Sequence, residues 1–290
     1  MNEKIASNSV AALLDYIDSQ LTSIYEERER QNIVVWLFAA FKQWSRSELI
    51  VRKDDRLSES EILKFHFATK RLKAGEPVQY VVGDVDFMGI NLKVNPSVLI
   101  PRPETEELVQ LILDENSDAS IRLIDIGTGS GCIPIALKIS RPSWDIQGID
   151  KSVNTLKTAE ANARLHSLDV SFKTMDIFES LEFNKKFDIL VSNPPYVLES
   201  DKANMSSQVV NHEPSLALFV TDNDPLIFYR RMLDLTAELL NPQAKVYFEI
   251  HENQAANMLE LCSSYPVVNV KVTKDMQGKD RMVSMIYSPN

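Results

Sequence analysis

Three glycines lie within five residues near the middle of the chain, between an apolar run typical of a buried strand and one typical of a helix. They are Gly127, Gly129 and Gly131, and the 290-residue chain has only eight glycines in all. Glycine adopts backbone conformations that other residues avoid and lets the main chain approach a ligand closely. This order of strand, turn and helix predicts a ligand at the helix N-terminus.

The glycine turn lies within a longer alternation of strand and helix patterns that begins at Pro103. Strands are predicted over residues 121–126, 145–149, 170–174, 187–191, 246–250, 267–272 and 282–287, and helices over 132–139, 153–166, 225–240 and 254–263. Such alternation predicts an α/β fold with a doubly wound, mostly parallel sheet. The last two strands are joined by only a short turn, so they should pair as an antiparallel edge.

The first 76 residues have a different pattern. Apolar residues recur at helical spacing over 10–21, 33–41 and 58–72, and the last of these begins with a capping box at Ser58. Gly75 and Pro77 end it. We therefore expect a small all-α domain over 1–76, a β-hairpin linker over 77–102 with strands near 78–82 and 87–94, and an α/β domain over 103–290.

Charge and composition exclude several classes of protein. Residues 1–78 carry 12 basic and 12 acidic side chains, whereas the rest carries 19 and 29, so the net charge of −10 lies in the α/β part. A protein that binds a nucleic-acid duplex would normally show a basic face there. Two distant cysteines and four scattered histidines predict no disulfide framework and no metal site. No membrane-length apolar run and no signal peptide after Met1 predict a cytoplasmic protein.

The spacing of the glycines distinguishes between cofactors. The dinucleotide fingerprint is Gly-x-Gly-x-x-Gly, but here the third glycine comes one residue early and Cys132 takes its place. The loop instead resembles the Gly-x-Gly-x-Gly loop of class I S-adenosylmethionine-dependent methyltransferases. We expect the whole loop to bind that cofactor, the alternative being a purely structural turn. Its residues are Gly127, Thr128, Gly129, Ser130 and Gly131.

Carboxylates follow the next two strands. Asp150 ends the second strand, 19 residues after Gly131, where a carboxylate can accept hydrogen bonds from both ribose hydroxyls. The alternative role for Asp150 is a helix N-cap. Asp176 follows the third strand and is placed to accept from an adenine amino group, with Ile177 packing on the ring. The alternative there is a turn aspartate beside a core isoleucine.

The sequence Asn193-Pro194-Pro195-Tyr196 follows the fourth strand and contains the only Pro-Pro pair in the chain. Two prolines fix φ and remove two backbone donors. The Pro194 carbonyl and the Asn193 side-chain oxygen can then accept both N–H groups of a planar NH2 group. This favours a pyramidal nitrogen whose lone pair is aimed at a methyl group, while Tyr196 stacks on the flat amide. A structural turn is the alternative.

This motif is shared by enzymes that methylate exocyclic amines of adenine or guanine and by those that methylate protein glutamine. Cytosine-C5 methylation needs a Pro-Cys nucleophile, and neither Cys132 nor Cys262 follows proline.

Together with further segments, these motifs resemble the bacterial protein-(glutamine-N5) methyltransferases that modify peptide chain release factors. The similarity runs along nearly the whole chain from Gly75. The matching segments are residues 75–80, Gly83, Phe87, residues 99–106, the glycine loop, residues 193–196, Glu213-Pro214 with Ala217-Leu218, Glu249-Ile250 with Gln254, and Asp275 with Gly278 and Arg281.

The resemblance implies a fold, a cofactor and a substrate. It implies that residues 127–131, Asp150 and Ile177 bind S-adenosylmethionine, and that residues 193–196 hold the glutamine of a Gly-Gly-Gln sequence in class-1 release factors. The helical segment would recognise the factor, with no direct contact to nucleic acid or membrane. Relatives often carry a larger aromatic residue at 177 and glycine at the positions of Pro225 and His251.

Other functions stay open at this point. A paralogous enzyme acts on a glutamine of a ribosomal protein, an adenine-N6 or guanine-N2 methyltransferase would act on nucleic acid, and a non-catalytic module would have lost Asn193 or the glycines. Two further roles are also open. The segment Ile100–Thr105 either caps the cofactor cleft or is a linker, and Glu249 either lines the cleft or serves a turn or cap.

Overall fold

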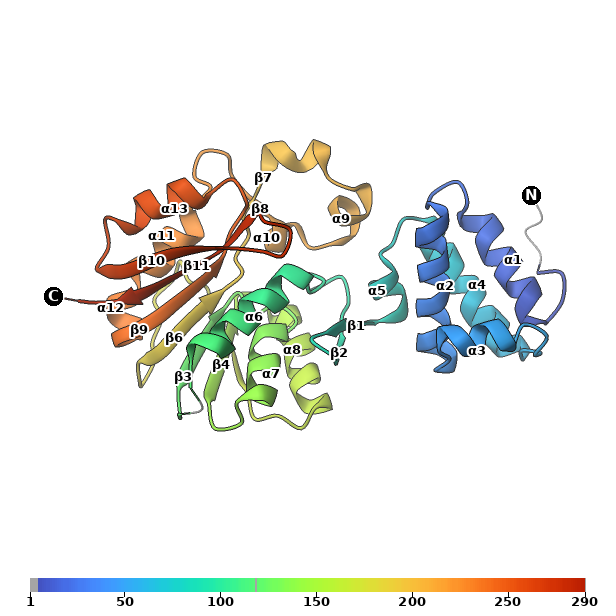
Figure 1. Cartoon of the computed structure of the whole chain (residues 1–290), viewed down its shortest axis with the longest axis horizontal. Helices are drawn as coiled ribbons and strands as arrows, with labels where there is room; N and C mark the ends of the chain where they lie inside the picture. Colours follow the sequence, from blue (N-terminus) through green and yellow to red (C-terminus); the bar gives the residue numbers. More distant parts are fainter. Residues whose placement is uncertain (1–4, 118, 290) are drawn as a thin grey trace. The chain divides into compact units, whose positions relative to one another are not determined.

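A computed structural model describes residues 5–117 and 119–289, which form two compact units (Figure 1). One unit takes the chain as far as Asp84 together with Ser206–His212. The other takes Val85–Met205 and the chain from Glu213 onward. The apolar cores respect this division, because the core of the first unit draws only on residues up to Val82 and those of the second begin at Val85.

The first unit is helical, as the sequence predicts. Its elements are α1 (Val10–Leu21), α2 (Glu27–Lys42), α3 (Arg46–Val51), α4 (Glu59–Lys73), α5 (Val78–Val82) and α9 (Ser207–His212). The capping box predicted at Ser58 is present: the Ser58 hydroxyl accepts from the Glu61 N–H, and the Glu61 carboxylate accepts from the Ser58 N–H. Buried residues such as Leu13, Phe38 and Phe65 share one core.

The prediction of a strand over residues 78–82 is wrong, because this segment forms helix α5. Its β-branched residues favour a strand locally, but Val78 and Val81 are buried in the core of the helical unit. The Arg71 guanidinium also donates to the carbonyls of Tyr80 (3.0 Å) and Val81 (3.1 Å), at the end of α5 where helical carbonyls lack partners. Tertiary packing thus overrides local propensity.

The β-hairpin exists, but only after α5. It pairs β1 (Asp84–Phe87) with β2 (Ile90–Lys93). Both turn residues, Met88 and Gly89, have positive φ (53° and 75°), as a tight two-residue hairpin turn requires.

The second unit is built on a sheet with the strand order β10-β11-β9-β6-β3-β4-β5. The strands are β3 (Arg122–Ile126), β4 (Asp145–Asp150), β5 (Ser171–Thr174), β6 (Phe187–Ser192), β9 (Leu240–Glu249), β10 (Val267–Lys274) and β11 (Asp280–Tyr287). β3 is parallel to β4 and β6, and β9 is parallel to β6. β11 is antiparallel to both β9 and β10, which confirms the predicted edge.

Helices cover both faces of this sheet (Figure 1). One face packs on α6 (Pro103–Glu115), α7 (Cys132–Ser140) and α8 (Val153–Leu165), and the other on α11 (Ile227–Asp234), α12 (Thr236–Leu239) and α13 (Ala255–Cys262). Alternate strand residues point to opposite faces: Ile189 and Val191 join the core under α6–α8, whereas Leu190 joins the other. The helix predicted over 225–240 is divided, since α11 and α12 are separate at Leu235.

The remaining elements lie between β6 and α11. They are β7 (Val197–Leu198), the 3-10 helix η1 (Glu199–Asn204), α10 (Ser215–Leu218) and β8 (Phe219–Val220). β7 and β8 form a short parallel pair.

The strand order determines where a ligand can bind. From β3 the chain moves outward through β4 and β5, and it then returns to form β6 on the other side of β3. The connections after β3 and β6 therefore diverge and leave a crevice at the carboxyl ends of these two strands, which is where open α/β sheets bind ligands.

Candidate active site

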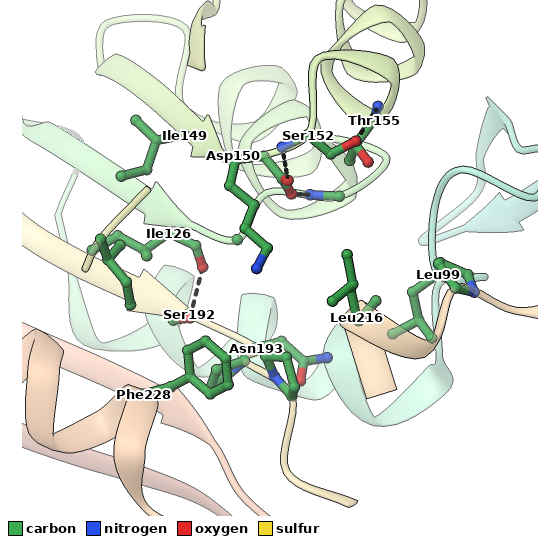
Figure 2. Close-up of a pocket in the computed structure, with 18 of the residues that line it drawn as sticks. Leu99, Ile126, Ile149, Asp150, Ser152, Thr155, Ser192, Asn193, Leu216 and Phe228 are labelled. Carbon is green, nitrogen blue, oxygen red and sulfur yellow. Dashed lines mark hydrogen bonds between the residues drawn. The ribbon is translucent and has the colours of Figure 1, made fainter. Parts of the chain in front are cut away.

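A pocket of about 300 Å³ lies at the carboxyl ends of the parallel strands (Figure 2). Its walls come from the ends of β3, β4, β5 and β6, from α11 and from the segments around residues 98 and 216. Most of the lining is apolar, and polar groups converge at its edges. Ligand pockets commonly have this size and composition.

The glycine loop forms the floor between β3 and α7. The N–H groups of Gly127 and Thr128 both donate to the Ile149 carbonyl, at 2.9 and 3.0 Å, which ties the loop to the end of β4. All three loop glycines have positive φ. Gly127 and Gly129 line the pocket, whereas a Cβ on Gly131 would lie 3.2–3.3 Å from three packed side chains. Gly131 therefore serves helix–sheet packing and the start of α7.

Asp150 lies at the end of β4, opposite the glycine loop, and lines the pocket (Figure 2). One carboxylate oxygen accepts from the Gly129 N–H (3.2 Å) and the other from the Ser152 N–H (2.9 Å). The N-cap of α8 is Ser152, whose hydroxyl accepts from the Thr155 N–H. Asp150 is thus not needed as a cap. Burial raises its pKa, and the backbone hydrogen bonds oppose that rise.

Asp176 and Ile177 form the wall after β5. Both line the pocket, and Ile177 is buried. One Asp176 oxygen accepts from the Phe178 N–H (3.0 Å), so the carboxylate also shapes its own turn. Phe228 and Met232 from α11 lie on the same pocket, and the sequence analysis does not identify them.

The turn after β6 lies beside the glycine loop. The Ser192 hydroxyl donates to the Ile126 carbonyl at 2.6 Å, which links the ends of β6 and β3 (Figure 2). Asn193, Pro194 and Pro195 all line the pocket. Tyr196 is not among the lining residues.

A buried carboxylate organises the far side of this turn. The Asn193 side-chain Nδ2 donates to Thr105 Oγ1 (3.0 Å), and that hydroxyl donates to Glu249 Oε2 (2.7 Å). The Tyr196 hydroxyl donates to the other oxygen, Oε1 (2.9 Å). Glu249 is 0% exposed, at the end of β9. Its burial raises the pKa, whereas the two hydroxyl donors and the positive charge of Arg281 oppose that rise.

Ser97, Val98 and Leu99 form a wall of the pocket, whereas no residue of the segment Ile100–Thr105 lines it. Glu213 holds this segment: its buried carboxylate accepts from the Ile100 N–H (3.1 Å) and from the Arg102 guanidinium (2.5 Å). Leu216, which follows Glu213 in the chain, lies on the same pocket and is 70% exposed. Leu99 and Leu216 lie on the same side of this pocket (Figure 2).

The structure brings most of the residues singled out in the sequence into one pocket. Those lining it are Gly127, Gly129, Asp150, Asp176, Ile177, Asn193, Pro194 and Pro195. Thr128, Ser130 and Gly131 lie in the loop without lining the pocket, and Tyr196 contacts Glu249 behind it. The sequence analysis did not identify Thr105 as a site residue. Its hydroxyl contacts a residue 144 positions away, and no local pattern in a Pro-Glu-Thr helix start predicts such a contact.

Buried polar atoms without a hydrogen bond of good geometry gather under the glycine loop. Within the described residues, the two carboxylate oxygens of Asp125 and the hydroxyls of Thr128 and Ser130 make no hydrogen bond of good geometry. Asp125 is 0% exposed. Burial raises its pKa to about 7, the neighbouring Thr128 hydroxyl opposes that rise, and the nearby charge of Asp150 adds to it. Such groups are retained mainly at ligand sites.

Other chemistries find little support. Burial raises the pKa of Cys132 to about 12, so its thiol is not a ready nucleophile. Among residues 5–117 and 119–289, no group of three His, Cys, Asp or Glu side chains is placed to hold a metal ion. The same residues contain no helix that is long and apolar enough to span a membrane.

Comparisons with known proteins agree with this architecture. Residues 104–216 match the family model of the methyltransferase small domain, and residues 12–83 match that of the PrmC N-terminal domain. The chain is 39% identical to the release factor glutamine methyltransferase of Flavobacterium psychrophilum, with 92% of this chain and 95% of that protein covered. It is 40% identical to the corresponding enzyme of Bacteroides thetaiotaomicron, with 93% and 97% covered.

A solved structure supports the fold. A methyltransferase from Pyrococcus furiosus superposes with a TM-score of 0.53 at 14% identity, covering 80% of this chain and all of that one.

Because the pKa of the Asp125 carboxyl is raised, we expect the stability of the folded protein to depend on pH. Between pH 4 and 7 the folded protein retains a proton that the unfolded chain has lost, so stability should fall as the pH rises through this window. Asp125→Asn removes the buried charge. Its stabilising effect on the ligand-free protein should therefore be about 1–3 kcal/mol larger at pH 8 than at pH 5. Urea denaturation at both pH values measures this. An Asn variant with the same relative stability at the two pH values would contradict the assignment.

Proposed function

The chain belongs to the release factor glutamine methyltransferases, and we propose that it methylates the glutamine of the Gly-Gly-Gln sequence in class-1 peptide chain release factors. The methyl group comes from S-adenosylmethionine and goes to the side-chain amide nitrogen, N5. Release factors act in translation termination, so we place the enzyme in the cytoplasm.

The observation that carries this proposal is the position of Asn193 and Pro194 beside the glycine loop, on one pocket with Asp150. A planar amide held at the Asn-Pro-Pro turn lies next to any methyl donor bound on the loop. Transfer then needs little beyond alignment, which by itself supplies a large part of a rate enhancement.

The pocket has the features that S-adenosylmethionine requires. Two glycines leave room for close backbone approach, and Asp150 has lone pairs left for ribose hydroxyls beyond its two backbone bonds. Ile126, Ile149 and Ile177 offer apolar surface for a purine ring. The buried carboxyl of Asp125, when ionised, gives the floor a negative potential that suits a cationic ligand. When bound, S-adenosylmethionine supplies a methyl carbon on a positively charged sulfur, which takes the electron pair of the broken bond.

The protein's own contribution is to hold the amide. In this proposal, Asn193 Oδ1 and the Pro194 carbonyl accept hydrogen bonds from the two N–H groups of the glutamine side chain. These bonds stabilise a pyramidal nitrogen. Positive charge develops on that nitrogen as the N–C bond forms, and these acceptors interact with it more strongly in the transition state than before. The charged N-methyl amide then releases a proton to water, so no strong base is required.

The helical unit is proposed to recognise the factor. Its core is separate from those of the catalytic unit, and residues 12–83 match the family model of the PrmC N-terminal domain. The catalytic unit would then need to read only the glutamine and its flanking residues.

A methyl-transfer assay tests the proposed function against its alternatives. The full-length protein is incubated with radiolabelled S-adenosylmethionine and, in separate reactions, a class-1 release factor, ribosomal proteins and DNA. Label on the release factor at the Gly-Gly-Gln glutamine, and its loss when that residue is changed to Ala, is the expected result. Label on a ribosomal protein or on DNA instead would select one of the alternatives.

Asp150→Ala should weaken S-adenosylmethionine binding by about 1–3 kcal/mol, because ribose hydroxyls would lose their acceptor. Isothermal titration calorimetry measures the change. Asp145→Ala serves as a control, since this carboxylate is exposed at the opposite end of the same strand. Equal affinities for the two variants would remove Asp150 from the site.

Asn193→Ala should lower kcat on the release factor by about 10²–10³, with a much smaller effect on KM. The fold should survive because the turn is fixed by Pro194 and Pro195 and by the Ser192 bond to β3. Single-turnover kinetics measure the loss. A wild-type rate in this variant would mean that the Asn-Pro-Pro turn is only structural.

Deleting residues 1–83 removes helices α1–α5 and leaves the hairpin and both sheet-face cores whole. S-adenosylmethionine affinity should be kept, whereas kcat/KM on the intact factor should fall strongly. Methylation of a short Gly-Gly-Gln peptide by the truncated and full-length proteins is the control. An unchanged kcat/KM on the whole factor would show that the helical unit does not recognise it.

A further inference from the structure

The orientation of the Asn193 side-chain amide decides what that residue offers to a ligand. One side of the amide is an acceptor oxygen and the other is a donor NH2 group. The proposed mechanism needs the oxygen in the pocket, because an NH2 group there would face the NH2 group of the substrate. Something in the protein must therefore distinguish two orientations that have nearly the same shape.

A chain of hydrogen bonds makes this distinction. The Thr105 hydroxyl has a single proton and donates it to Glu249 Oε2 at 2.7 Å. Towards Asn193 it can then only accept, and it does so from Nδ2 at 3.0 Å. Turning the amide over would place Oδ1 against Thr105 Oγ1, so that two acceptors would face each other. The donor side is thus held at Thr105, which leaves Oδ1 for the pocket.

Glu249 sets the direction of this chain because an ionised carboxylate can only accept. Its other oxygen accepts from the Tyr196 hydroxyl at 2.9 Å, so that one carboxylate fixes residues on both sides of the proline pair. The group cannot easily move. It is fully buried, and a hydroxyl donor holds each of its two side-chain oxygens.

We propose that Glu249 is a positioning residue that acts through Thr105 to hold the Asn193 amide with its oxygen towards the substrate, and directly to fix Tyr196. This inference rests on the proposed function, since it concerns how the glutamine NH2 group is received. It explains why a carboxylate is buried at the end of β9, where it does not itself line the pocket. It also gives the Pro-Glu-Thr start of α6 a role in the site.

Thr105→Val and Thr105→Ser are the matched pair that tests the proposal. Valine keeps the shape and loses the hydroxyl, which frees the amide to turn, whereas serine keeps the hydroxyl. Single-turnover methylation of a release factor should slow by about 10–100-fold in Thr105→Val, the cost of a misplaced reacting group. Thr105→Ser should retain most of the wild-type rate. KM for the factor and the Kd of S-adenosylmethionine should change little in both.

Glu249→Gln tests the same chain from its other end. A glutamine amide has one accepting side, so it cannot accept from both hydroxyls, and one of the two must reverse. The rate should fall, because either the Asn193 amide or the Tyr196 side chain loses its fixed orientation. Tyr229→Phe is the control for stability, because it removes a buried hydrogen bond to the Glu249 main chain and leaves the side-chain contacts in place. It should lower Tm and keep the rate.

A second measurement is independent of activity. In nuclear magnetic resonance spectra, the Asn193 side-chain NH2 protons should exchange with solvent more slowly in the wild type and in Thr105→Ser than in Thr105→Val. If Thr105→Val does not fold, Glu249→Gln carries the same expectation.

The possible results separate the two levels of inference. A folded Thr105→Val with the wild-type rate, a Thr105→Ser as slow as the valine variant, or a Tyr229→Phe as slow as Glu249→Gln would overturn the positioning role. A wild-type enzyme that methylates no release factor would overturn the proposed function instead, and the slow NH2 exchange would then report only that the hydrogen-bond chain exists.

Discussion

The pairing of β3 with both β4 and β6 is the constraint on which the site depends. Because the connections from β3 and β6 leave in opposite directions, a crevice forms at the carboxyl ends of these strands. The Ser192 hydroxyl bond to the Ile126 carbonyl then fixes the two strand ends relative to each other. The glycine loop and the Asn-Pro-Pro turn are adjacent for this reason, although about 65 residues separate them in the chain.

Two fully buried carboxylates lie close to this crevice, and the fold treats them differently. Glu249 accepts from two hydroxyls and lies near a positive charge, so its burial is compensated and it can serve as a rigid reference for its neighbours. Asp125 makes no hydrogen bond of good geometry among the described residues, only the neighbouring Thr128 hydroxyl opposes the effect of its burial, and its pKa is raised to about 7. An uncompensated charge of this kind costs stability. Its position under the glycine loop fits the view that strain is tolerated where a ligand binds.

The residues that line this pocket are held in place by other residues that do not line it. Glu213 ties the segment before α6 to the start of α10, and so joins two walls that come from distant parts of the chain. Thr105 and Glu249 likewise fix the Asn-Pro-Pro turn through hydrogen bonds. The positioned residues are surrounded by packed, hydrogen-bonded neighbours, as precise alignment of a poor nucleophile requires.

Much of this protein follows from its sequence alone. The strand and helix periodicities, the glycine spacing and the proline pair are local signals, because each depends on the backbone preferences of a few neighbouring residues. They predicted the doubly wound sheet, its antiparallel edge and the helical N-terminal part. They also predicted eight of the residues that line the pocket: Gly127, Gly129, Asp150, Asp176, Ile177, Asn193, Pro194 and Pro195. The tertiary structure decided the rest. Residues 78–82 have the β-branched pattern of a strand and became a helix, since burial against α2 and α4 and the Arg71 caps outweigh local propensity. The contact of Thr105 with Glu249 likewise spans 144 residues, and only the assembled sheet brings such positions within hydrogen-bonding distance.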